Sequence, residues 1–215
     1  VVFTGGNGQA MLPILVLDAY LAGLGVRSIF LRDTNSLCYL HGITSLGADL
    51  PSSKRGLADL IAQTAPQDEI YTLGFSLGGF GALQFLDAYP QSQLLLFSPA
   101  TSTEALFIKQ IMDFRLPMMF QKIQQRCQGQ DLDCRTVLQK SARPAPVTIL
   151  YNAANRVDRL HAANIADGET VEIFALEGAN THASLFNLIL KGQLPSVLSG
   201  DLAGIRQTLG RETFA

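Results

Sequence analysis

The sequence lacks the features that mark several large classes of protein. It has no run of basic residues and its formal net charge is only −2, which argues against nucleic acid or an anionic membrane as the main partner. No apolar stretch is long enough for a transmembrane helix, and no signal peptide is visible. Internal repeats and low-complexity segments are absent as well. We therefore expect a globular protein that acts on a small molecule.

Cysteine is scarce, and the chain contains only Cys38, Cys127 and Cys134. The odd count excludes a complete disulfide framework, and no C-x-x-C pair is present to bind a metal. Cys127 and Cys134 could pair locally, whereas the simpler interpretation is three reduced thiols in a cytoplasmic protein. We expect a cytoplasmic location and neither a metal nor an organic cofactor.

The composition is that of a compact globule with a large core. Hydrophobic residues make up 47% of the 215 residues and charged residues only 16%, which argues against a disordered chain. This length is typical of one domain, and we expect residues 1–215 to form a single domain. The chain begins Val-Val-Phe without a methionine, so we also expect an additional N-terminal segment or domain before Val1.

Strand-like and helix-like segments alternate along the chain. Short apolar runs predict strands, and apolar residues at helical spacing predict the helices between them. The predicted strands are residues 1–3, 28–31, 70–73, 94–97, 147–151 and 170–175. The predicted helices are residues 11–24, a segment capped by Ser52 or Ser53 that runs to about Thr64, a segment from Gly79, and residues 184–190. Strands separated by helices imply right-handed crossovers and a largely parallel sheet.

The most informative stretch is Gly-Phe-Ser-Leu-Gly at residues 74–78, which matches the pattern G-x-S-x-G. It lies between a predicted strand and a predicted helix, so Ser76 falls at the tip of a tight turn with strained backbone geometry. Gly74 and Gly78 have no Cβ atom, which lets the strand and the helix approach closely and lets Ser76 point out of the sheet. The helix begins just after the serine, so the free N–H of Leu77 faces any negative charge that forms there.

This stretch has two other interpretations. The first is an ordinary glycine-rich turn between a strand and a helix that has no catalytic role, and this alternative stays open. A dinucleotide-binding loop that opens at Gly79 and Gly81 is excluded, because the third glycine of G-x-G-x-x-G would fall at Gln84.

Residues 101–143 lie between two predicted strands and are too many for a simple crossover. Apolar residues at helical spacing predict a helix with a bend or break near Pro117, followed by a polar loop at residues 127–135. In one interpretation this insertion is a helical cap whose apolar side chains line an acyl pocket. In the other, its apolar face only packs on the sheet. The side chains expected to line the pocket are Met112, Phe114, Met118, Met119 and Phe120.

This order of segments resembles the α/β-hydrolase family. A strand, the Gly-Phe-Ser-Leu-Gly turn and a helix are followed by a cap-sized insertion, an acid and a histidine. The resemblance covers residues 1 to about 190. It implies a mostly parallel α/β-hydrolase sheet flanked by helices, with a helical cap at residues 101–143, and the family's first two strands have no counterpart in the chain.

The resemblance implies a catalytic triad in the chain order nucleophile, acid, histidine. His182 follows the last predicted strand, as the family's histidine does, although a surface-loop histidine is the alternative. Asp158 is the only carboxylate in the loop after residues 147–151, and its alternative role is the N-cap of a helix that begins at Arg159. The family often places the acid nearer the strand, where this chain has Asn155. The other candidate acids are Asp167, Glu172 and Glu177.

An oxyanion hole needs a second donor besides the N–H of Leu77. By the resemblance, this donor lies in the glycine-rich loop Thr4-Gly5-Gly6-Asn7 after the first strand. We choose the N–H of Gly6, with Asn7 as the alternative, and a tight turn without a ligand stays open. Only a backbone N–H is required there, so Thr4 in place of the family's usual histidine is tolerable.

The remaining candidates concern substrate binding and the other histidines. Asn7, Phe75, Met112 and Met118 are expected to bind substrate. His161 has the neighbours of a helix residue and is expected to be structural. His41 lies in a loop from which it could contact substrate.

A serine hydroxyl is too weakly acidic to attack a carbonyl unaided, so His182 would take its proton and return it to the leaving group. Asp158 would fix the imidazole tautomer and stabilise the imidazolium. The predicted function is therefore a serine hydrolase, a carboxylesterase or thioesterase, that forms an acyl-enzyme on Ser76. Two alternatives stay open: an acyltransferase or depsipeptide-forming enzyme with the same triad, and a non-catalytic hydrolase-like binding domain of a larger protein.

Overall fold

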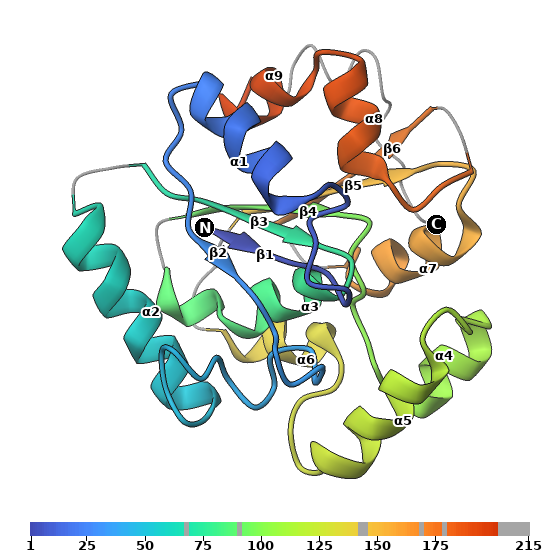
Figure 1. Cartoon of the computed structure of the whole chain (residues 1–215). Coiled ribbons are helices and arrows are strands. Elements are labelled where there is room, and N and C mark those ends of the chain that lie inside the picture. The colour runs from blue at the N-terminus through green and yellow to red at the C-terminus, as the bar shows by residue number, and fades with distance from the viewer. Residues whose placement is uncertain (67–68, 90–91, 142–145, 168–169, 178–179, 202–215) are drawn as a thin grey trace.

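The computed structural model describes residues 1–66, 69–89, 92–141, 146–167, 170–177 and 180–201. Within these residues one six-stranded, parallel sheet has the strand order β2-β1-β3-β4-β5-β6 (Figure 1). The strands are β1 (Val2–Phe3), β2 (Phe30–Leu31), β3 (Tyr71–Phe75), β4 (Gln93–Phe97), β5 (Val147–Asn152) and β6 (Val171–Leu176). The predicted parallel sheet is therefore confirmed, and each strand differs from its prediction by one or two residues at an end.

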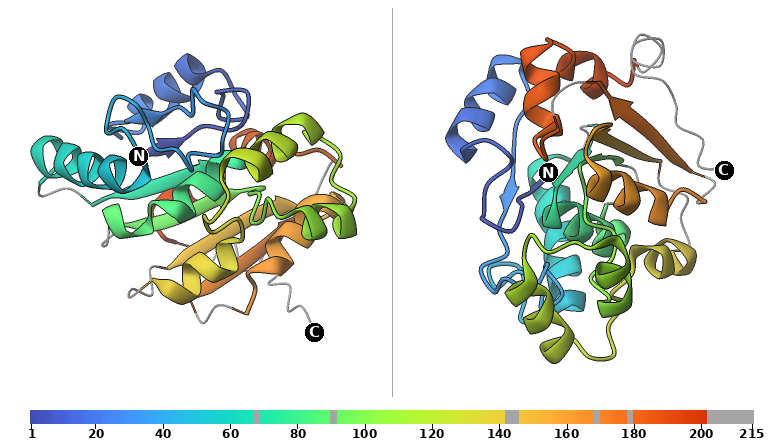
Figure 2. Two further views of the ribbon diagram at one scale, coloured as in Figure 1. Left: turned by 90° about the horizontal axis from the view of Figure 1, so that it is seen from below. Right: turned by 90° about the vertical axis from the view of Figure 1, so that its right-hand side faces the viewer.

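Helices cover both faces of the sheet (Figure 1, Figure 2). The helices on one face are α1 (Ile14–Gly23), α8 (Ser184–Leu190) and α9 (Leu194–Leu198). Those on the other face are α2 (Leu50–Thr64), α3 (Leu77–Gln84), α6 (Cys134–Lys140) and α7 (Arg156–Asn164). A short 3-10 helix, η1 (Leu86–Ala88), follows α3. The sequence predicts α8 at its observed bounds and predicts neither α9 nor η1.

Strand β4 illustrates why the strands appear in the sequence as continuous runs of apolar residues. Leu94 and Leu96 join the core on the side of α3 and α6, while Leu95 and Phe97 join the core on the side of α1 and α8. Successive side chains of a strand point to opposite faces, so a strand covered on both sides is apolar at every position.

The first helix begins later than its apolar pattern predicts. Met11 has a positive φ of 60°, which is incompatible with a helix, and Pro13 precedes the first helical residue. The N–H of Ile14 donates to the side-chain oxygen of Gln9 (3.2 Å), which satisfies one of the free N–H groups at the helix start. Residues 11–13 therefore belong to the loop after β1 and not to α1.

The prediction that Ser52 or Ser53 caps the second helix is wrong. α2 begins at Leu50, and its N-cap is Asp49, whose carboxylate accepts from the N–H of Ser52 (2.8 Å). The Ser52 hydroxyl in turn accepts from the N–H of Asp49 (3.1 Å), which completes a capping box. Ser53 is buried and its hydroxyl accepts from the N–H of Ile43 (2.8 Å), so it holds the preceding loop instead.

The insertion between β4 and β5 divides into two parts within its described residues. α6 packs against α3 in the helical layer of the sheet. α4 (Ala105–Ile111) and α5 (Pro117–Arg126) contact each other and lie together, apart from that layer (Figure 1, Figure 2). The predicted break falls at residues 112–116, and Pro117 begins α5. The predicted loop at residues 127–135 ends at the start of α6, and residues 142 and 143 of the insertion lie outside the described residues.

All three cysteines are buried free thiols. Burial raises the pKa of the Cys38, Cys127 and Cys134 thiols, which keeps them protonated and unreactive. None of the helices in the described ranges is long and apolar enough to cross a membrane.

Gly78, at the start of α3, is expected to tolerate no side chain. A Cβ atom there would lie 2.2 Å from the carbonyl oxygen of Phe3, which belongs to the backbone of β1. We expect Gly78→Ala to lower the free energy of unfolding by about 1–3 kcal/mol or more, as measured by urea denaturation.

Gly23→Ala in α1 is the matched control, because nothing lies within 4 Å of a Cβ atom at Gly23. Alanine favours a helix over glycine by up to about 1 kcal/mol, so this variant is expected to be as stable as the wild type or more so. Wild-type stability of Gly78→Ala would contradict the close packing of α3 on β1.

Candidate active site

Ser76 occupies the sharp turn between β3 and α3, at the centre of the carboxyl edge of the sheet. Its backbone has φ 54° and ψ −120°, a strained conformation for a residue with a side chain. The N–H of Ser76 donates to the carbonyl oxygen of Phe97 (3.1 Å). The carbonyl oxygen of Ser76 accepts from the N–H groups of Gly79 (3.0 Å) and Ala100 (2.9 Å). A Cβ atom at Gly74 would lie 2.7 Å from the Cα of Gly79. The predicted strain at the serine and the close approach of strand and helix are both confirmed.

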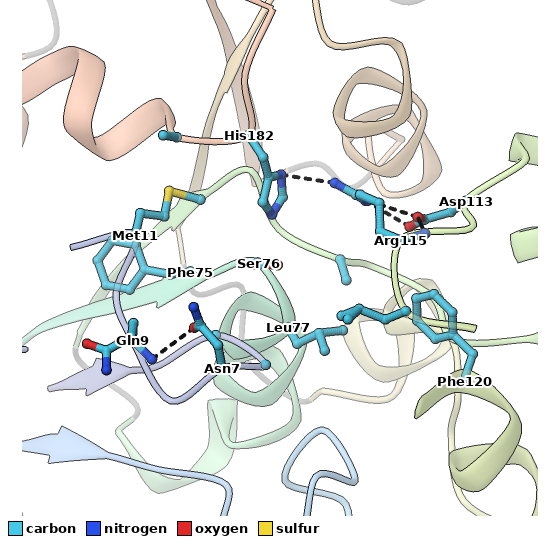
Figure 3. Close-up of a pocket in the computed structure, with 15 residues that line it drawn as sticks. Asn7, Gln9, Met11, Phe75, Ser76, Leu77, Asp113, Arg115, Phe120 and His182 are labelled. Carbon is cyan, nitrogen blue, oxygen red and sulfur yellow. Dashed lines mark hydrogen bonds and ion pairs between the residues drawn. The ribbon is translucent and has the colours of Figure 1, made fainter. Parts of the chain in front are cut away.

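His182 and Asp158 form a hydrogen-bonded pair near this turn. Asp158 projects from α7 and is fully buried, while His182 lies just before α8 and its side chain is 33% exposed. The Nδ1 atom of His182 lies 2.8 Å from both carboxylate oxygens. Because a carboxylate only accepts, Nδ1 is the donor to Asp158, and Nη1 of Arg115, which also only donates, lies beside Nδ1 without a hydrogen bond to it. In the neutral ring, Nε2 then has a free lone pair. Figure 3 shows the imidazole above Ser76, with its second nitrogen directed toward the serine.

Ser76 and His182 line one cavity of about 460 Å³. The other lining residues are Gly5, Gly6, Asn7, Gln9, Met11, Phe75, Leu77, Ala100, Asp113, Arg115, Leu116, Phe120 and Ala183 (Figure 3). The hydrogen bonds of the described residues do not include one between the Ser76 hydroxyl and His182. Contacts of this kind often tighten only when a substrate is bound.

The start of α7 distinguishes the two roles considered for Asp158. Asn155 is the N-cap of α7, and its side-chain oxygen accepts from the N–H of Asp158 (3.1 Å). Asp158 therefore lies within the first turn, and its alternative role as N-cap is wrong. The acids considered as alternatives do not line the cavity in the described part of the chain: Asp167, Glu172 and Glu177.

Gly6 and Leu77 are neighbours in the cavity wall. A Cβ atom at Gly6 would lie 2.8 Å from Cδ1 of Leu77. Among the described residues, neither backbone N–H donates to another protein group, so both can donate to an oxygen in the cavity. Asn7 and Phe75 also line the cavity. The side-chain oxygen of Asn7 accepts from the N–H of Gln9 (3.0 Å), which leaves its NH₂ group able to donate (Figure 3).

A comparison with protein-family models gives no match, and a comparison with curated proteins gives none either. Among solved structures, the chain is similar to a proline iminopeptidase-related protein from Thermus thermophilus, with a TM-score of 0.52 and 13% identity. That similarity covers 94% of this chain and 88% of the other. The chain has the α/β-hydrolase fold. At this identity the likeness establishes the fold alone.

Two further solved structures are similar to the chain at lower TM-scores. Alpha/beta hydrolase domain-containing protein 10 from mouse has a TM-score of 0.45 and 14% identity, over 91% of this chain and 89% of the other. Est816, described as an N-acyl homoserine lactone degrading enzyme, has a TM-score of 0.31 and 16% identity, over 65% of this chain and 73% of the other. Neither likeness carries an argument, because both scores are below 0.5.

On this α/β-hydrolase fold, the prediction that Met112 and Met118 line the pocket is wrong. Met112 is 56% exposed and Met118 is 76% exposed, and neither lines the cavity. α5 buries Phe120, which does line it, and Met118 lies two residues earlier, about half a turn around the helix. Met112 follows the end of α4 with φ 56°, so helical spacing no longer predicts its direction. Phe114, in the same interruption, is 67% exposed.

Some lining residues are not predicted from the sequence. Leu116 lies between α4 and α5, and Met11, which the apolar pattern assigns to the first helix, lies in the loop after β1. His41, which could have contacted substrate, does not line the cavity. Its Nε2 atom lies 3.3 Å from the carbonyl oxygen of Arg126 at the end of α5.

A charged cluster adjoins His182 at the edge of the cavity. Arg115 donates from Nε to Asp113 Oδ1 (2.8 Å) and from Nη2 to Asp113 Oδ2 (2.8 Å), and its Nη1 donates to Asp158 Oδ1 (2.7 Å). The same Nη1 lies 3.0 Å from Nδ1 of His182. Burial alone would raise the pKa of Asp113, but hydrogen bonds from Arg115 and His161 outweigh it and hold this pKa well below its usual range. The described residues nevertheless include no group of three or more side chains placed to hold a metal ion.

His161 is structural, as its sequence context predicts. It is fully buried, and its Nδ1 accepts from the N–H of Thr101 (3.1 Å). Its proton is therefore on Nε2, which donates to Asp113 Oδ2 (3.1 Å). Burial lowers the pKa of His161, so the side chain stays neutral. The sequence does contain one signal of this cluster, since Asp113 and Arg115 interrupt an apolar run.

His161 is expected to make the stability of the protein depend on pH. Because its pKa is lowered in the folded state, the unfolded chain takes up a proton below about pH 6.5 while the folded protein resists it. The contribution is complete above that pH and declines as the pH falls, by up to about 1.4 kcal/mol per pH unit. We expect His161→Gln to be less stable at pH 8 but to lose less stability down to pH 5, as measured by urea denaturation.

His41→Gln is the control for replacing a histidine, because His41 lies at the surface, away from the cluster. A slope for His161→Gln equal to that of the wild type would show that His161 does not titrate as a buried neutral group.

Proposed function

We propose that the protein is a serine hydrolase that cleaves a carboxylic ester or thioester through an acyl-enzyme on Ser76. One observation carries the proposal: Ser76, the Asp158-paired His182 and the unpartnered N–H groups of Gly6 and Leu77 line the same cavity. The α/β-hydrolase fold alone would not suffice, because one fold can host many functions.

In the first half of the reaction, the Ser76 hydroxyl attacks the carbonyl carbon of the substrate, and its proton passes to Nε2 of His182. The hydrogen bond from Nδ1 to Asp158 favours this transfer, because it stabilises the imidazolium that forms. The carbonyl oxygen becomes an oxyanion, which accepts hydrogen bonds from the N–H groups of Gly6 and Leu77. Each such donor contributes about 3–4 kcal/mol to stabilising the transition state.

Acylation is completed when the tetrahedral intermediate collapses and the bond to the leaving alcohol or thiol breaks. His182 gives its proton to that leaving group, which leaves the acyl chain as an ester on Ser76. A water molecule then attacks this ester and His182 accepts its proton. The bond between the acyl carbon and Oγ breaks, His182 returns the proton to Oγ, and the acid is released. The mostly apolar wall of Met11, Phe75, Leu116 and Phe120 suits an apolar acyl or leaving group.

We expect a fluorophosphonate probe to label the wild-type protein at Ser76 and to leave Ser76→Ala unlabelled. On a panel of p-nitrophenyl esters of increasing acyl length, Ser76→Ala and His182→Ala are expected to lose turnover about equally, by about 10⁴- to 10⁶-fold, because the two groups act as a unit. Asp158→Ala is expected to lose less. Activity is measured by release of p-nitrophenolate, with circular dichroism to confirm that each variant is folded.

The same panel distinguishes the competing functions. Full turnover by His182→Ala would contradict the assignment of the base. An absence of labelling in the folded wild type would favour a non-catalytic binding domain. Transfer of the acyl group to an added alcohol or amine, in preference to water, would favour an acyltransferase with the same triad.

Leu116 is expected to limit the length of the acyl chain or leaving group. It lines the cavity near Gly6, where a Cβ atom would lie 3.4 Å from Cδ1 of Leu116. Leu116→Ala removes three carbon atoms from the wall, and each methylene that the substrate then buries adds about 0.8 kcal/mol, or about fourfold in kcat/KM. We expect the preferred p-nitrophenyl ester to shift to a longer chain.

Met118→Ala is the matched control, since Met118 lies two residues away but outside the cavity. It should keep the wild-type preference. An unchanged preference in Leu116→Ala, with activity retained, would place the acyl group elsewhere.

A further inference from the structure

Arg115 lies between two buried carboxylates at the edge of the cavity. It belongs to the short segment between α4 and α5, and its side chain is 35% exposed, whereas those of Asp113 and Asp158 are almost completely buried. Figure 3 shows its guanidinium group between Asp113 and the imidazole of His182. Neither the predicted triad nor the predicted pocket includes this residue.

Asp158 is a completely buried carboxylate that is paired with a cation. An ionised carboxylate removed from water is unfavourable unless it is both paired and hydrogen-bonded. In the described residues, the side chain of Asp158 accepts from two groups, Nη1 of Arg115 and Nδ1 of His182. Of these two partners, Arg115 is the one whose side chain is always a cation, and its Nη1 lies 2.7 Å from Asp158 Oδ1.

Arg115 is itself held in place by a chain of hydrogen bonds. Its guanidinium forms two parallel hydrogen bonds to Asp113, a geometry that fixes its plane as well as its position. Asp113 accepts a further hydrogen bond from Nε2 of His161, and the N–H of Thr101 holds the other nitrogen of that ring. The chain therefore extends from the loop after β4, through α7 and the segment between α4 and α5, to Asp158.

The charges of this cluster fit a histidine that gains a proton during the reaction. Two carboxylates, those of Asp113 and Asp158, face a single guanidinium, that of Arg115. The carboxylate of Asp158 is the group that stabilises a positive charge on His182. Arg115, whose Nη1 lies 3.0 Å from Nδ1, contributes by holding that carboxylate in place and not by its own charge.

We propose that Arg115 is a positioning residue for the reaction: it holds the carboxylate of Asp158 turned toward Nδ1 of His182. This inference rests on the proposed hydrolase function. Through Arg115, the segment between α4 and α5 supports the catalytic acid in addition to forming a wall of the cavity.

The kinetic test uses Arg115→Gln, which removes the charge but keeps a hydrogen-bond donor. We expect kcat to fall by about 10- to 100-fold, the range typical of groups that orient another functional group, while KM changes by less than about threefold. Asp113→Asn leaves Arg115 charged but weakens its anchor, and a smaller fall in kcat is expected. It also serves as the second variant if Arg115→Gln does not fold.

Arg156→Gln is the matched control. Arg156 also joins α7 to the α4–α5 region, since its Nη1 donates to the carbonyl of Ile111 (3.1 Å). Among the described residues it forms no hydrogen bond or ion pair with Asp158 or His182. A general loosening of the α4–α5 region would lower activity in Arg156→Gln as much as in Arg115→Gln. The proposal predicts near-wild-type kcat for Arg156→Gln.

A second measurement does not depend on catalysis. The proton on Nδ1 of His182 should give a downfield resonance in the proton NMR spectrum, assigned by its loss in His182→Gln. We expect Arg115→Gln to weaken or remove this resonance and Arg156→Gln to retain it. If the wild type hydrolyses no ester, the hydrolase proposal fails, yet this resonance still decides whether Arg115 holds the pair.

An unchanged resonance together with an unchanged kcat in Arg115→Gln would overturn the proposal. So would equal losses in Arg115→Gln and Arg156→Gln. If Arg115→Gln does not fold, an unchanged kcat and resonance in Asp113→Asn would overturn it as well.

Discussion

The contact between β3 and α3 holds Ser76 in a conformation that few residues with a side chain adopt. At Gly74 a Cβ atom would lie 2.7 Å from the Cα of Gly79, so the strand and the helix can approach this closely only because Gly74 has no side chain. β3 is paired on both sides, by β1 and β4, so the turn projects from the middle of the sheet. Because the strands are parallel, the segments after β1, β5 and β6 reach the same edge as Ser76. The glycine-rich loop, α7 with Asp158, and His182 are brought together in this way.

Buried charge places a second constraint on the site. A buried carboxylate is unfavourable unless it is paired and hydrogen-bonded, and the structure pairs the fully buried Asp158 with Arg115 as well as with His182. Arg115 comes from the segment that interrupts the insertion between α4 and α5, and it is anchored by Asp113 and His161. The insertion therefore contributes two kinds of contact: apolar lining from Leu116 and Phe120, and a cation next to the acid. Residues 113–116 therefore supply both the ion pairs of Arg115 and the apolar contact of Leu116 with the cavity.

Local patterns in the sequence predict the turn at Ser76, the parallel direction of the strands and the bounds of α8, because each depends on neighbouring residues. They fail where the outcome depends on competition or on distance. Asp49 and Ser52 compete for the same cap, and composition does not decide between them. Met118 and Phe120 both fit an apolar helix, but only packing against the rest of the chain decides which one faces the cavity. Arg115 meets Asp158 and His182 across 43 and 67 positions, a contact that no local pattern contains.

The most direct measurement is a crystal structure of the protein after reaction with a fluorophosphonate. The proposed function predicts a phosphorus atom bonded to Oγ of Ser76, with one phosphonyl oxygen within hydrogen-bond distance of the N–H groups of both Gly6 and Leu77. Nε2 of His182 should lie within hydrogen-bond distance of Oγ, and Nδ1 should remain bonded to Asp158. A phosphonyl group attached to another residue, or one whose oxygen lies away from both N–H groups, would contradict the site.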